Sequence, residues 1–347
     1  MKSKKAKILL ALVVLVILVL VVGLFYLQGL DEAKDPSDTE LRTVEIVAGS
    51  STTDIGDTLE AAGIIEDSGR FRLFSKIKGY DGKYMAGTYP LSPAMTPSEI
   101  AAILMSGITP GVDFTIQEGL NTKEIAEKLD QQGICSAEDF LNEAENGTFD
   151  YAFLDGDVTG IYRLEGFLFP DTYSLPVDAD AHTIISIFLD NFDAKFTPEM
   201  RQQAKDRGMT ISEVVTVASL VEKEAKKDEE RPIVASVIYN RMEQGMKLEL
   251  CSTIQFLLGE AKEELTYDDL AIESPYNTYT EVGLPPGPIG NPGLSSLQAA
   301  VEPADTEYLY FVVSEKLDGS HNFSKDYAKF EQDKEAYWNA YDAAKGN

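Results

Sequence analysis

Cysteine and histidine are scarce in this sequence. The 347-residue chain contains two cysteines, Cys135 and Cys251, and two histidines, His182 and His321. Two cysteines cannot form the disulfide framework of a small secreted domain, and we expect two buried thiols rather than one bridge. The histidines lie far apart, and an isolated histidine is more often a hydrogen-bonded structural residue than a metal ligand or a base. The sequence therefore predicts no metal site and no other cofactor.

Basic residues are also few. Lysine and arginine together number 30 against 58 aspartates and glutamates, so the formal net charge is -28 at pH 7. Phosphate binding needs a basic surface, so this balance excludes nucleic acid as a partner and disfavours adhesion to anionic lipid headgroups. The 44% content of hydrophobic residues is typical of a folded protein. An acidic exterior of this kind suits polar, non-anionic substrates.

Charged residues are absent from Ile8 to Leu27, directly after a tail, MKSKKAK, that carries four lysines. About twenty apolar residues span a bilayer as a helix. We predict a cytoplasmic tail over residues 1–7, a transmembrane helix over 8–28 and a polar linker over 29–42, with the rest of the chain outside the cell membrane. The alternative is a signal sequence that is removed on export. Both interpretations make the body of the protein extracytoplasmic.

The sequence contains an internal repeat with an offset of 70 residues. TVEIVAGSSTTDIGDTLEAAGII begins at Thr43, and DFTIQEGLNTKEIAEKLDQQGIC begins at Asp113. Five positions match in the two copies: Ile46 with Ile116, Gly49 with Gly119, Ile55 with Ile125, Leu59 with Leu129, and Gly63 with Gly133. Each copy predicts a short strand, a glycine turn, a capped helix and a glycine that ends the helix.

The helices of this region have recognisable caps. Thr52 or Thr53 is the expected cap in the first copy, and Thr122 is the expected cap in the second. After the first copy, a strand ends at Tyr89, and Thr96 opens another helix. Residues 43 to 107 therefore predict a βααβ-like module, and the second copy leads into the next domain.

The rest of the chain mixes strands and helices. An aromatic, proline-bounded stretch over residues 163–176 predicts a strand or loop, and residues 181–196 predict an amphipathic helix. Residues 306–324 predict two strands around an Asp-Gly-Ser turn, and a polar helix closes the chain. The sequence therefore predicts an α+β fold, with a small module over residues 43–110 and a larger domain over residues 111–347.

One helix carries two glutamates at the end of an aliphatic run, VASLVEKEAKK. Thr210 and Glu213 form a capping box, so this helix begins near Ile211. The helical neighbours of Glu224 are bulky and aliphatic, whereas Glu222 has smaller neighbours. Both glutamates lie close to the apolar face of the helix, where a carboxyl group is unusual.

The surroundings of the two glutamates predict different roles. Partial burial of Glu224, and Asp228 four residues later, both favour the protonated carboxyl that a general acid needs. The spacing of Glu222 from Lys226, four residues later, predicts an ordinary surface ion pair. The alternative for both glutamates is a solvated helix end with no chemistry.

Two further segments offer polar groups to a ligand. Asn240 and Arg241 lie near the end of the next helix, where Arg241 either stabilises the helix terminus or holds a polar ligand. A loop over residues 273–293 is rich in proline, glycine, asparagine and tyrosine, and long loops inside a domain are usually functional. Its amides, hydroxyls and aromatic faces suit carbohydrate: Tyr276, Asn277, Thr278 and Tyr279. The alternative is a rigid surface loop whose prolines only limit unfolded-state entropy.

From about Thr43 to near Asp326 the chain resembles the YceG-like endolytic murein transglycosylases. The motifs that carry the resemblance follow in this order: LEGFLFPDTY, ASLVEKE, ASVIYNRM with GMKL, SPYNTY, GLPPGPIGNPG, and YLYFV followed by HNFS. The family implies membrane-anchored enzymes of the bacterial cell wall. It also implies that residues 43–110 form a LysM-like module and that residues 111–347 form the catalytic domain.

The resemblance implies that Glu224 is the catalytic acid, with Glu222 as the alternative. The acid would protonate the oxygen between N-acetylmuramic acid and N-acetylglucosamine, and the muramic C6 hydroxyl would close on C1 as a 1,6-anhydro end. We expect four residues to hold the sugars or the developing charge: Asn240, Tyr276, Asn277 and Tyr279. The expected substrate is nascent peptidoglycan, and the expected partners are its synthases and division or elongation proteins. The alternatives are a non-catalytic glycan-binding scaffold and a hydrolase that uses water.

Overall fold

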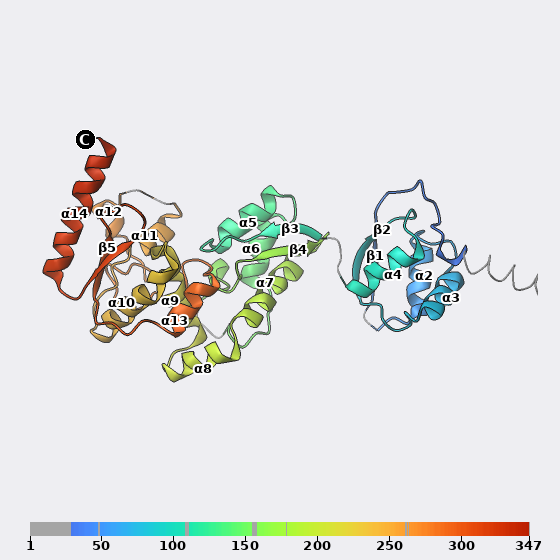
Figure 1. Cartoon of the computed structure of the whole chain (residues 1–347), viewed down its shortest axis with the longest axis horizontal. Coiled ribbons are helices and arrows are strands. Elements are labelled where there is room, and N and C mark those ends of the chain that lie inside the picture. Colours follow the sequence, from blue (N-terminus) through green and yellow to red (C-terminus); the bar gives the residue numbers. More distant parts are fainter. Residues whose placement is uncertain are drawn as a thin grey trace, which may run out of the picture. The chain divides into compact units, whose positions relative to one another are not determined.

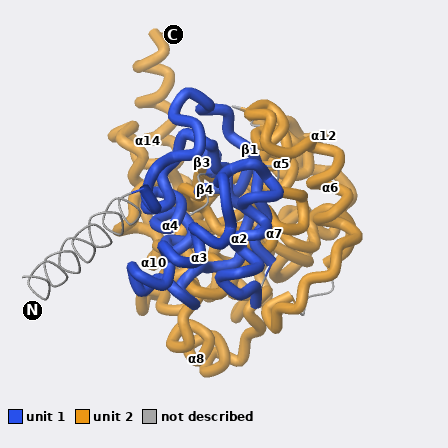
Figure 2. Tube along the Cα trace, turned by 90° about the vertical axis from the view of Figure 1, so that its right-hand side faces the viewer, with its two compact units in different colours: residues 1–113, 174–178 blue, residues 114–173, 179–347 orange. Residues whose placement is uncertain are grey.

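The computed structural model describes residues 29–346, except for residues 48, 108–110, 155–157, 178, 261 and 263. The chain divides into two compact units (Figure 2): unit 1 runs to Asp113 and includes residues 174–178, and unit 2 contains the rest. The predicted tail and transmembrane helix lie outside the described residues. No helix in the described part of the chain is long and apolar enough to cross a membrane. The described elements mix helices with small two-stranded sheets, which confirms the α+β class.

The described elements that lie entirely within unit 1 are one antiparallel strand pair, three α-helices and a 3-10 turn (Figure 1). In chain order these elements are β1 (Arg42–Ile46), α2 (Thr52–Ala61), α3 (Ser68–Lys78), β2 (Gly87–Leu91) and α4 (Pro97–Ser106), after a short 3-10 turn, η1 (Gly29–Asp31). β1 runs antiparallel to β2, so the order up to β2 is βααβ. α4 follows behind the predicted Thr96 capping box.

The core of unit 1 follows from the pattern of its strands and helices. β1 alternates exposed and buried residues over Val44 and Ile46, which face the helices. Ile55 and Leu59 are one helical turn apart on α2 and are both buried against this face. Tyr89 is fully buried in the middle of β2 and not at its end, and its hydroxyl donates to the Met85 carbonyl.

The caps of the repeat lie one or two positions before the predicted threonines. Ser51 caps α2, because its side chain accepts a hydrogen bond from the backbone amide of Asp54. Asn121 caps α5 in the same way by accepting from the amide of Glu124. Thr52, Thr53 and Thr122 are therefore not the caps. The cap residue must keep extended backbone, and the threonines are already inside the helices.

The second copy of the repeat builds the same order of elements. β3 (Gly111–Thr115) leads into α5 (Thr122–Gln131) and α6 (Ala137–Asn146), and β4 (Thr172–Pro176) pairs with β3. The boundary between the two units falls within both strands. The copy therefore completes its own βααβ arrangement, which is longer than the strand and helix predicted from the sequence.

The remaining elements belong to unit 2. They are α7 (Ala181–Lys195), α8 (Pro198–Asp206), α9 (Ile211–Glu224), α10 (Arg231–Glu243), α11 (Cys251–Leu258), α12 (Tyr267–Leu270), α13 (Leu294–Val301), β5 (Tyr310–Val313), β6 (His321–Ser324) and α14 (Tyr327–Lys345), with short 3-10 turns η2 (Gly160–Tyr162) and η3 (Asp228–Glu230). The predicted hairpin is confirmed, since β5 runs antiparallel to β6. The predicted helix over 181–196 and the closing helix are also confirmed as α7 and α14.

α9 is the central helix of unit 2. It begins behind the predicted capping box of Thr210 and Glu213, and every residue from Val214 to Val221 is buried. α10, α11 and α13 pack around it (Figure 1). A helix that is apolar on all sides needs cover on all sides. This surrounding cover fixes the end of α9, where Glu222 and Glu224 lie.

Candidate active site

Glu224 is the last residue of α9, and it lines a cavity of about 450 Å³ within unit 2. The other walls come from the segment that opens α11, from Tyr279, from β5 and from α14. Cavities of this size are typical of ligand sites. The helix ends at this point because Ala225 has extended backbone, with φ -93° and ψ 113°. The carboxyl of Glu224 is therefore held by a buried helix at the edge of an open space.

Burial is the main cause that raises the pKa of Glu224 above its ordinary value. The hydroxyl and backbone amide of Ser252, at the start of α11, oppose this shift, and so does His321. The side chain of Ser252 is itself buried, and its Oγ makes no hydrogen bond of regular geometry with any residue that the structure describes. Asp228 is not among these causes, so the predicted contribution of that carboxylate is wrong. α9 ends at Glu224, and Asp228 instead forms an ion pair with Arg231.

Glu222 is a structural anchor rather than a surface residue. Its side chain is 8% exposed, and one of its oxygens lies 2.8 Å from Nη1 of Arg231. The same oxygen accepts hydrogen bonds from the backbone amide of Gly293 and from the hydroxyl of Ser296, both at 2.9 Å. The predicted surface pair with Lys226 is wrong, because Glu222 faces the start of α13 and not the solvent. Glu222 ties three segments together, and it does not line the cavity of Glu224.

The loop over residues 273–293 brings one predicted side chain to the cavity. Tyr279 lines it, and the Tyr279 hydroxyl lies 3.0 Å from the sulfur of Cys251. Asn277 is fully buried beneath the loop. The Asn277 amide donates to the carbonyls of Leu270 and Ile272, and its oxygen accepts from the backbone amide of Tyr279. Asn277 therefore shapes the turn that presents Tyr279.

The structure places the other two predicted sugar contacts away from Glu224. Tyr276 packs on Phe256, with ring centroids 5.3 Å apart, and burial raises the pKa of Tyr276 to about 12. Asn240 donates both of its side-chain hydrogen bonds, at 2.9 Å, to the carbonyls of Thr306 and Tyr308. Neither residue lines the cavity of Glu224. Asn240 thus holds the backbone before β5, and Tyr276 packs against α11.

A histidine that is not among the predicted site residues lies at the cavity. His321, at the start of β6, lines it, and the His321 Nδ1 lies 2.7 Å from a carboxylate oxygen of Glu230. The same carboxylate also accepts a hydrogen bond from the backbone amide of His321. Such a contact fixes the orientation of the ring. The motif HNFS contains this histidine, but only the fold shows that it lies near residues of α9. His182 is elsewhere, where its Nδ1 contacts Glu143.

Arg241 and Glu249 form a second charged pair on the cavity wall. The guanidinium of Arg241 donates to the carbonyls of Leu309, Lys247 and Leu248, and its Nη1 lies 3.4 Å from the Glu249 carboxylate. Arg241 thus acts mainly as a structural residue. Glu249 has a positive φ of 50°, which is uncommon for a residue with a side chain. Its amide donates to the carbonyl of Thr278, which holds this conformation in place.

The loop that contains GLPPGPIGNPG is hydrogen-bonded to α9 through residues that do not line the cavity. The backbone amide of Ile289 donates to the hydroxyl of Ser219 at 3.1 Å. The side-chain amide of Asn291 donates to Glu165, and its oxygen accepts from the backbone amide of Leu168. Glu165 is buried, and burial raises its pKa to about 8. The motifs LEGFLFPDTY and GLPPGPIGNPG therefore meet in a buried polar network that the sequence did not predict.

Both cysteines are free thiols. This confirms the expectation that they form no bridge. The expectation that both are buried is wrong, because Cys251 is exposed where α11 begins at the cavity, and Cys135 is half-buried.

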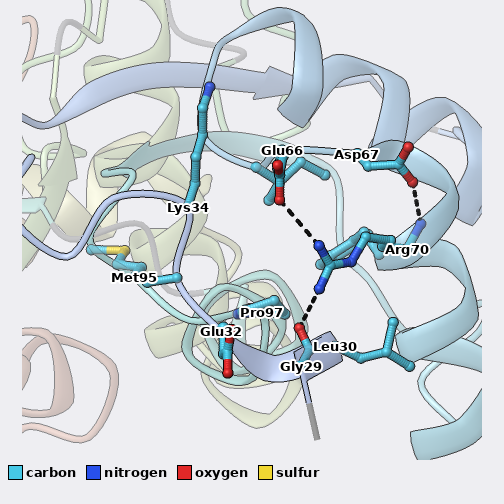
Figure 3. A pocket seen from close by; sticks show the side chains of 12 residues that line it. Gly29, Leu30, Glu32, Lys34, Glu66, Asp67, Arg70, Met95 and Pro97 are labelled. Atoms are coloured by element: carbon cyan, nitrogen blue, oxygen red, sulfur yellow. Dashed lines mark hydrogen bonds and ion pairs between the residues drawn. The ribbon is translucent and has the colours of Figure 1, made fainter. Parts of the chain in front are cut away.

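Two other hollows are less suited to this chemistry. A larger one of about 960 Å³ lies between α8 and α13, and Glu224 does not line it. In unit 1, a small cavity of about 70 Å³ lies beside Arg70 (Figure 3). Arg70 donates there to Glu66 and to the carbonyl of Gly29, so its charge is already paired. A cavity of this size holds a few water molecules but no sugar ring.

Comparisons with known proteins agree with the motifs. A family model described as the YceG-like family matches residues 44–336. A protein of Bacillus subtilis named endolytic murein transglycosylase is 32% identical over 333 residues, and the match covers 91% of each chain. A Streptococcus pneumoniae protein of the same name is 33% identical over 305 residues, and the match spans 55% of its length.

A solved structure also resembles this chain. It is a crystal structure of a YceG-like protein from Listeria monocytogenes, and the two chains share 33% sequence identity. The TM-score is 0.57, and the match covers 84% of this chain and 99% of the other.

Proposed function

Because this chain belongs to the YceG-like family, we propose that it is an endolytic lytic transglycosylase, a lyase that acts on peptidoglycan. The observation that carries the proposal is the position of Glu224. Its carboxyl has a raised pKa and lies at the edge of a cavity of about 450 Å³. A general acid at near-neutral pH needs such a group within reach of its substrate.

The proposed reaction uses Glu224 twice and consumes no water. The protonated carboxyl gives its proton to the oxygen that joins C1 of N-acetylmuramic acid to N-acetylglucosamine, and the C1–O bond breaks. The carboxylate then takes the proton of the muramic C6 hydroxyl while that oxygen bonds to C1. The product ends in a 1,6-anhydro ring.

The surroundings of Glu224 suit both states of the acid. Burial favours the protonated carboxyl before bond cleavage, while Ser252 and His321 favour the carboxylate that remains afterwards. These two influences act on the protonation equilibrium in opposite directions. We assign the sugar-contacting role first to Tyr279, which lines the cavity. For Asn277 and Asn240 we propose a supporting role through the backbone that they hold, and for Tyr276 a supporting role through its packing on Phe256.

The proposal includes a place in the cell. The apolar run after the lysine-rich tail would anchor the chain by a single transmembrane helix, with the two units outside the cytoplasm. The βααβ order of residues 42–91 supports a LysM-like module close to the membrane. In this arrangement the enzyme would cut nascent strands beside the synthases and the division or elongation proteins.

Mass spectrometry of the products tests the proposed function. Incubation of the full chain with uncrosslinked glycan strands should give 1,6-anhydro-muramic ends. Glu224→Gln should lower the rate by about 10²- to 10⁴-fold without unfolding, because the amide cannot donate the proton. Glu229→Gln is a matched control, since Glu229 is exposed and does not line the cavity.

Three other outcomes would change the assignment. Free reducing ends in place of anhydro ends would show that the enzyme is a hydrolase. Glycan binding without any cleavage would favour a scaffold protein. Full loss of cleavage in folded Glu222→Gln, with activity kept in Glu224→Gln, would move the acid to Glu222.

The pH dependence gives a further check on Glu224. The carboxyl must be protonated to act as the acid, and its pKa is above the ordinary value of 4.5. The rate should therefore fall as pH rises through this raised pKa. Ser252→Ala removes an interaction that stabilises the carboxylate, so it should move this fall to higher pH.

A further inference from the structure

The last helix of the chain carries a row of aromatic side chains along the cavity of Glu224. Tyr327, Phe330, Lys334, Tyr337 and Trp338 of α14 all line this cavity. Their spacings of three and four residues place most of them on one face of the helix. One wall of the proposed active site is therefore largely aromatic over more than two helical turns.

The first and second halves of this helix face have different packing partners. The first half packs on β5, because Tyr310 lies 5.6 Å from Tyr327 and 5.5 Å from Phe330 between ring centroids. The second half extends past the strand. There Trp338 is 40% exposed, and it forms an aromatic cluster with Tyr337 and Tyr341, at centroid distances of 5.2 and 5.6 Å.

We propose that the second half of α14 is a glycan subsite, formed by Tyr337, Trp338 and Tyr341, that binds sugar rings away from the bond that Glu224 cuts. The proposal rests on the proposed function. It adds a site that binds the glycan strand at a distance from the bond that is cleaved. Pyranose rings have an apolar face of C–H groups, which stacks on flat aromatic side chains. Lys334 lies on the same wall. Its ammonium group forms a surface ion pair with Glu331 at 3.4 Å, and a pair this exposed can exchange Glu331 for a carboxylate of a peptide stem.

Two observations favour a glycan strand as the occupant. Tyr337 and Trp338 of the cluster line the same cavity as Glu224, so a strand seated at the acid meets α14 as well. Lys334 interrupts the aromatic row with a charge, which is unfavourable at the centre of an apolar helix–helix contact. A second copy of the chain is therefore the less suitable occupant. Trp338 and Tyr341 lie beyond the residues that match the family model.

Trp338 makes the subsite directly observable, because it is the only tryptophan in the sequence. The full chain with Glu224→Gln is titrated with uncrosslinked glycan strands, so that binding occurs without turnover. Trp338 emission should shift or be quenched with a saturable dependence on strand concentration. An N-acetylglucosamine tetramer, which lacks peptide stems, should give a weaker response of the same kind if Lys334 contributes to stem binding.

Kinetics of the otherwise wild-type chain test the role of the ring. Trp338→Ala should raise KM for strands by about fivefold to tenfold with little change in kcat, because one stacking contact is lost. Trp338→Phe keeps an aromatic face and should restore most of the affinity. Tyr267→Ala is the matched control, since Tyr267 is 91% exposed and does not line the cavity.

The outcomes separate this inference from the proposed function. If the wild-type chain cleaves strands while Trp338 emission stays constant and the KM of Trp338→Ala stays within twofold, the subsite is refuted and the enzyme assignment stands. If nothing is cleaved but Trp338 responds to strands, the subsite stands and the enzyme assignment falls. An emission change that follows protein concentration without glycan would identify a contact between copies and overturn the subsite.

Discussion

The two copies of the repeat have the same local structure. Gly49 and Gly119 both turn the chain with positive φ, at 84° and 79°, between the strand and the helix. Leu59 and Leu129 are both fully buried on the following helix. In each copy, two helices follow the strand before a second strand pairs with it. The repeated positions are thus those that fix the turn and the core.

The copies differ in what their glycine turns face. Within the described part of the chain, no atom of another segment lies within 4 Å of the Cβ position at Gly49. At Gly119 the same position lies 3.7 Å from the side chain of Glu222, and the amide of Gly119 donates to the carbonyl of Asn291. The second copy therefore supports the end of α9, which carries Glu224. Residues outside the repeat, rather than within it, decide which copy serves the site.

Truncation of a buried leucine in each copy should show the largest difference between the two copies in stability and activity. Leu59→Ala and Leu129→Ala remove matched, fully buried side chains, and each should destabilise its own unit by about 2–5 kcal/mol. Leu129→Ala should also lower cleavage, because α5 belongs to the unit that contains Glu224. Leu59→Ala should leave cleavage by the folded protein unchanged. Amide hydrogen exchange resolved by segment, with product analysis, measures both effects.

The predicted difference between the two copies is wrong if Leu59→Ala abolishes cleavage while the amides of unit 2 remain protected. The first copy would then take part in the reaction itself. Equal losses of protection in both units from either variant would show instead that the units unfold together.

The buried carboxyl of Glu165 should make the stability of the two units differ with pH. Its pKa is raised from 4.5 to about 8, because burial disfavours the charge. Between these values the unfolded chain loses a proton that the folded chain keeps, so the stability of unit 2 falls as pH rises. The expected loss is on the order of 5 kcal/mol, complete near pH 8. Among the described residues, unit 1 buries no carboxylate, so its stability should change little.

Chemical denaturation at pH 5 and pH 8 measures this difference. Glu165→Gln should flatten the pH dependence of unit 2, at a lower overall stability because the amide replaces one of two hydrogen-bond acceptors. A variant that keeps the full pH dependence would show that another group causes it.

Features that depend on residues close together in the sequence were predictable, whereas contacts between distant segments were not. The caps of α9 and α4, the hairpin of β5 and β6, and the closing helix depend on neighbours within a few residues, and they were predicted. The pairing of Glu222 with Arg231, Gly293 and Ser296 joins segments up to 74 residues apart. Nothing near Glu222 in sequence indicates such partners, so its role was predicted wrongly.

The candidate site was predictable only where a motif marked it. Glu224 and Tyr279 lie in quoted motifs, and both line one cavity. Asn240 and Asn277 also lie in motifs, but their amides hold backbone carbonyls, since a buried amide must satisfy its donors wherever the fold places them. His321 reaches the site through the β5–β6 hairpin, and its spacing from Glu224 carries no periodic signal.

Alanine at the two glycine turns should have similar effects on stability and different effects on activity. Gly49→Ala and Gly119→Ala force a side chain into positive φ, which costs about 1–2 kcal/mol at each position. Only Gly119→Ala should also lower kcat, because strain in its turn is transmitted to Asn291 and to the end of α9. Urea unfolding and steady-state kinetics provide the comparison. A kcat for Gly119→Ala equal to that of Gly49→Ala would contradict the supporting role of the second copy.

Removal of the two helix caps should give the smallest losses of stability, and the two losses should be closely matched. Ser51 and Asn121 each accept a hydrogen bond from the third helical amide, and each belongs to a capping box. Ser51→Ala and Asn121→Ala should therefore each cost about 1 kcal/mol. Thr122→Ala should cost less than Asn121→Ala, because the Thr122 hydroxyl makes no hydrogen bond among the described residues. Urea midpoints of the three variants measure the order. A larger loss from Thr122→Ala than from Asn121→Ala would show that the threonine, rather than the asparagine, caps α5.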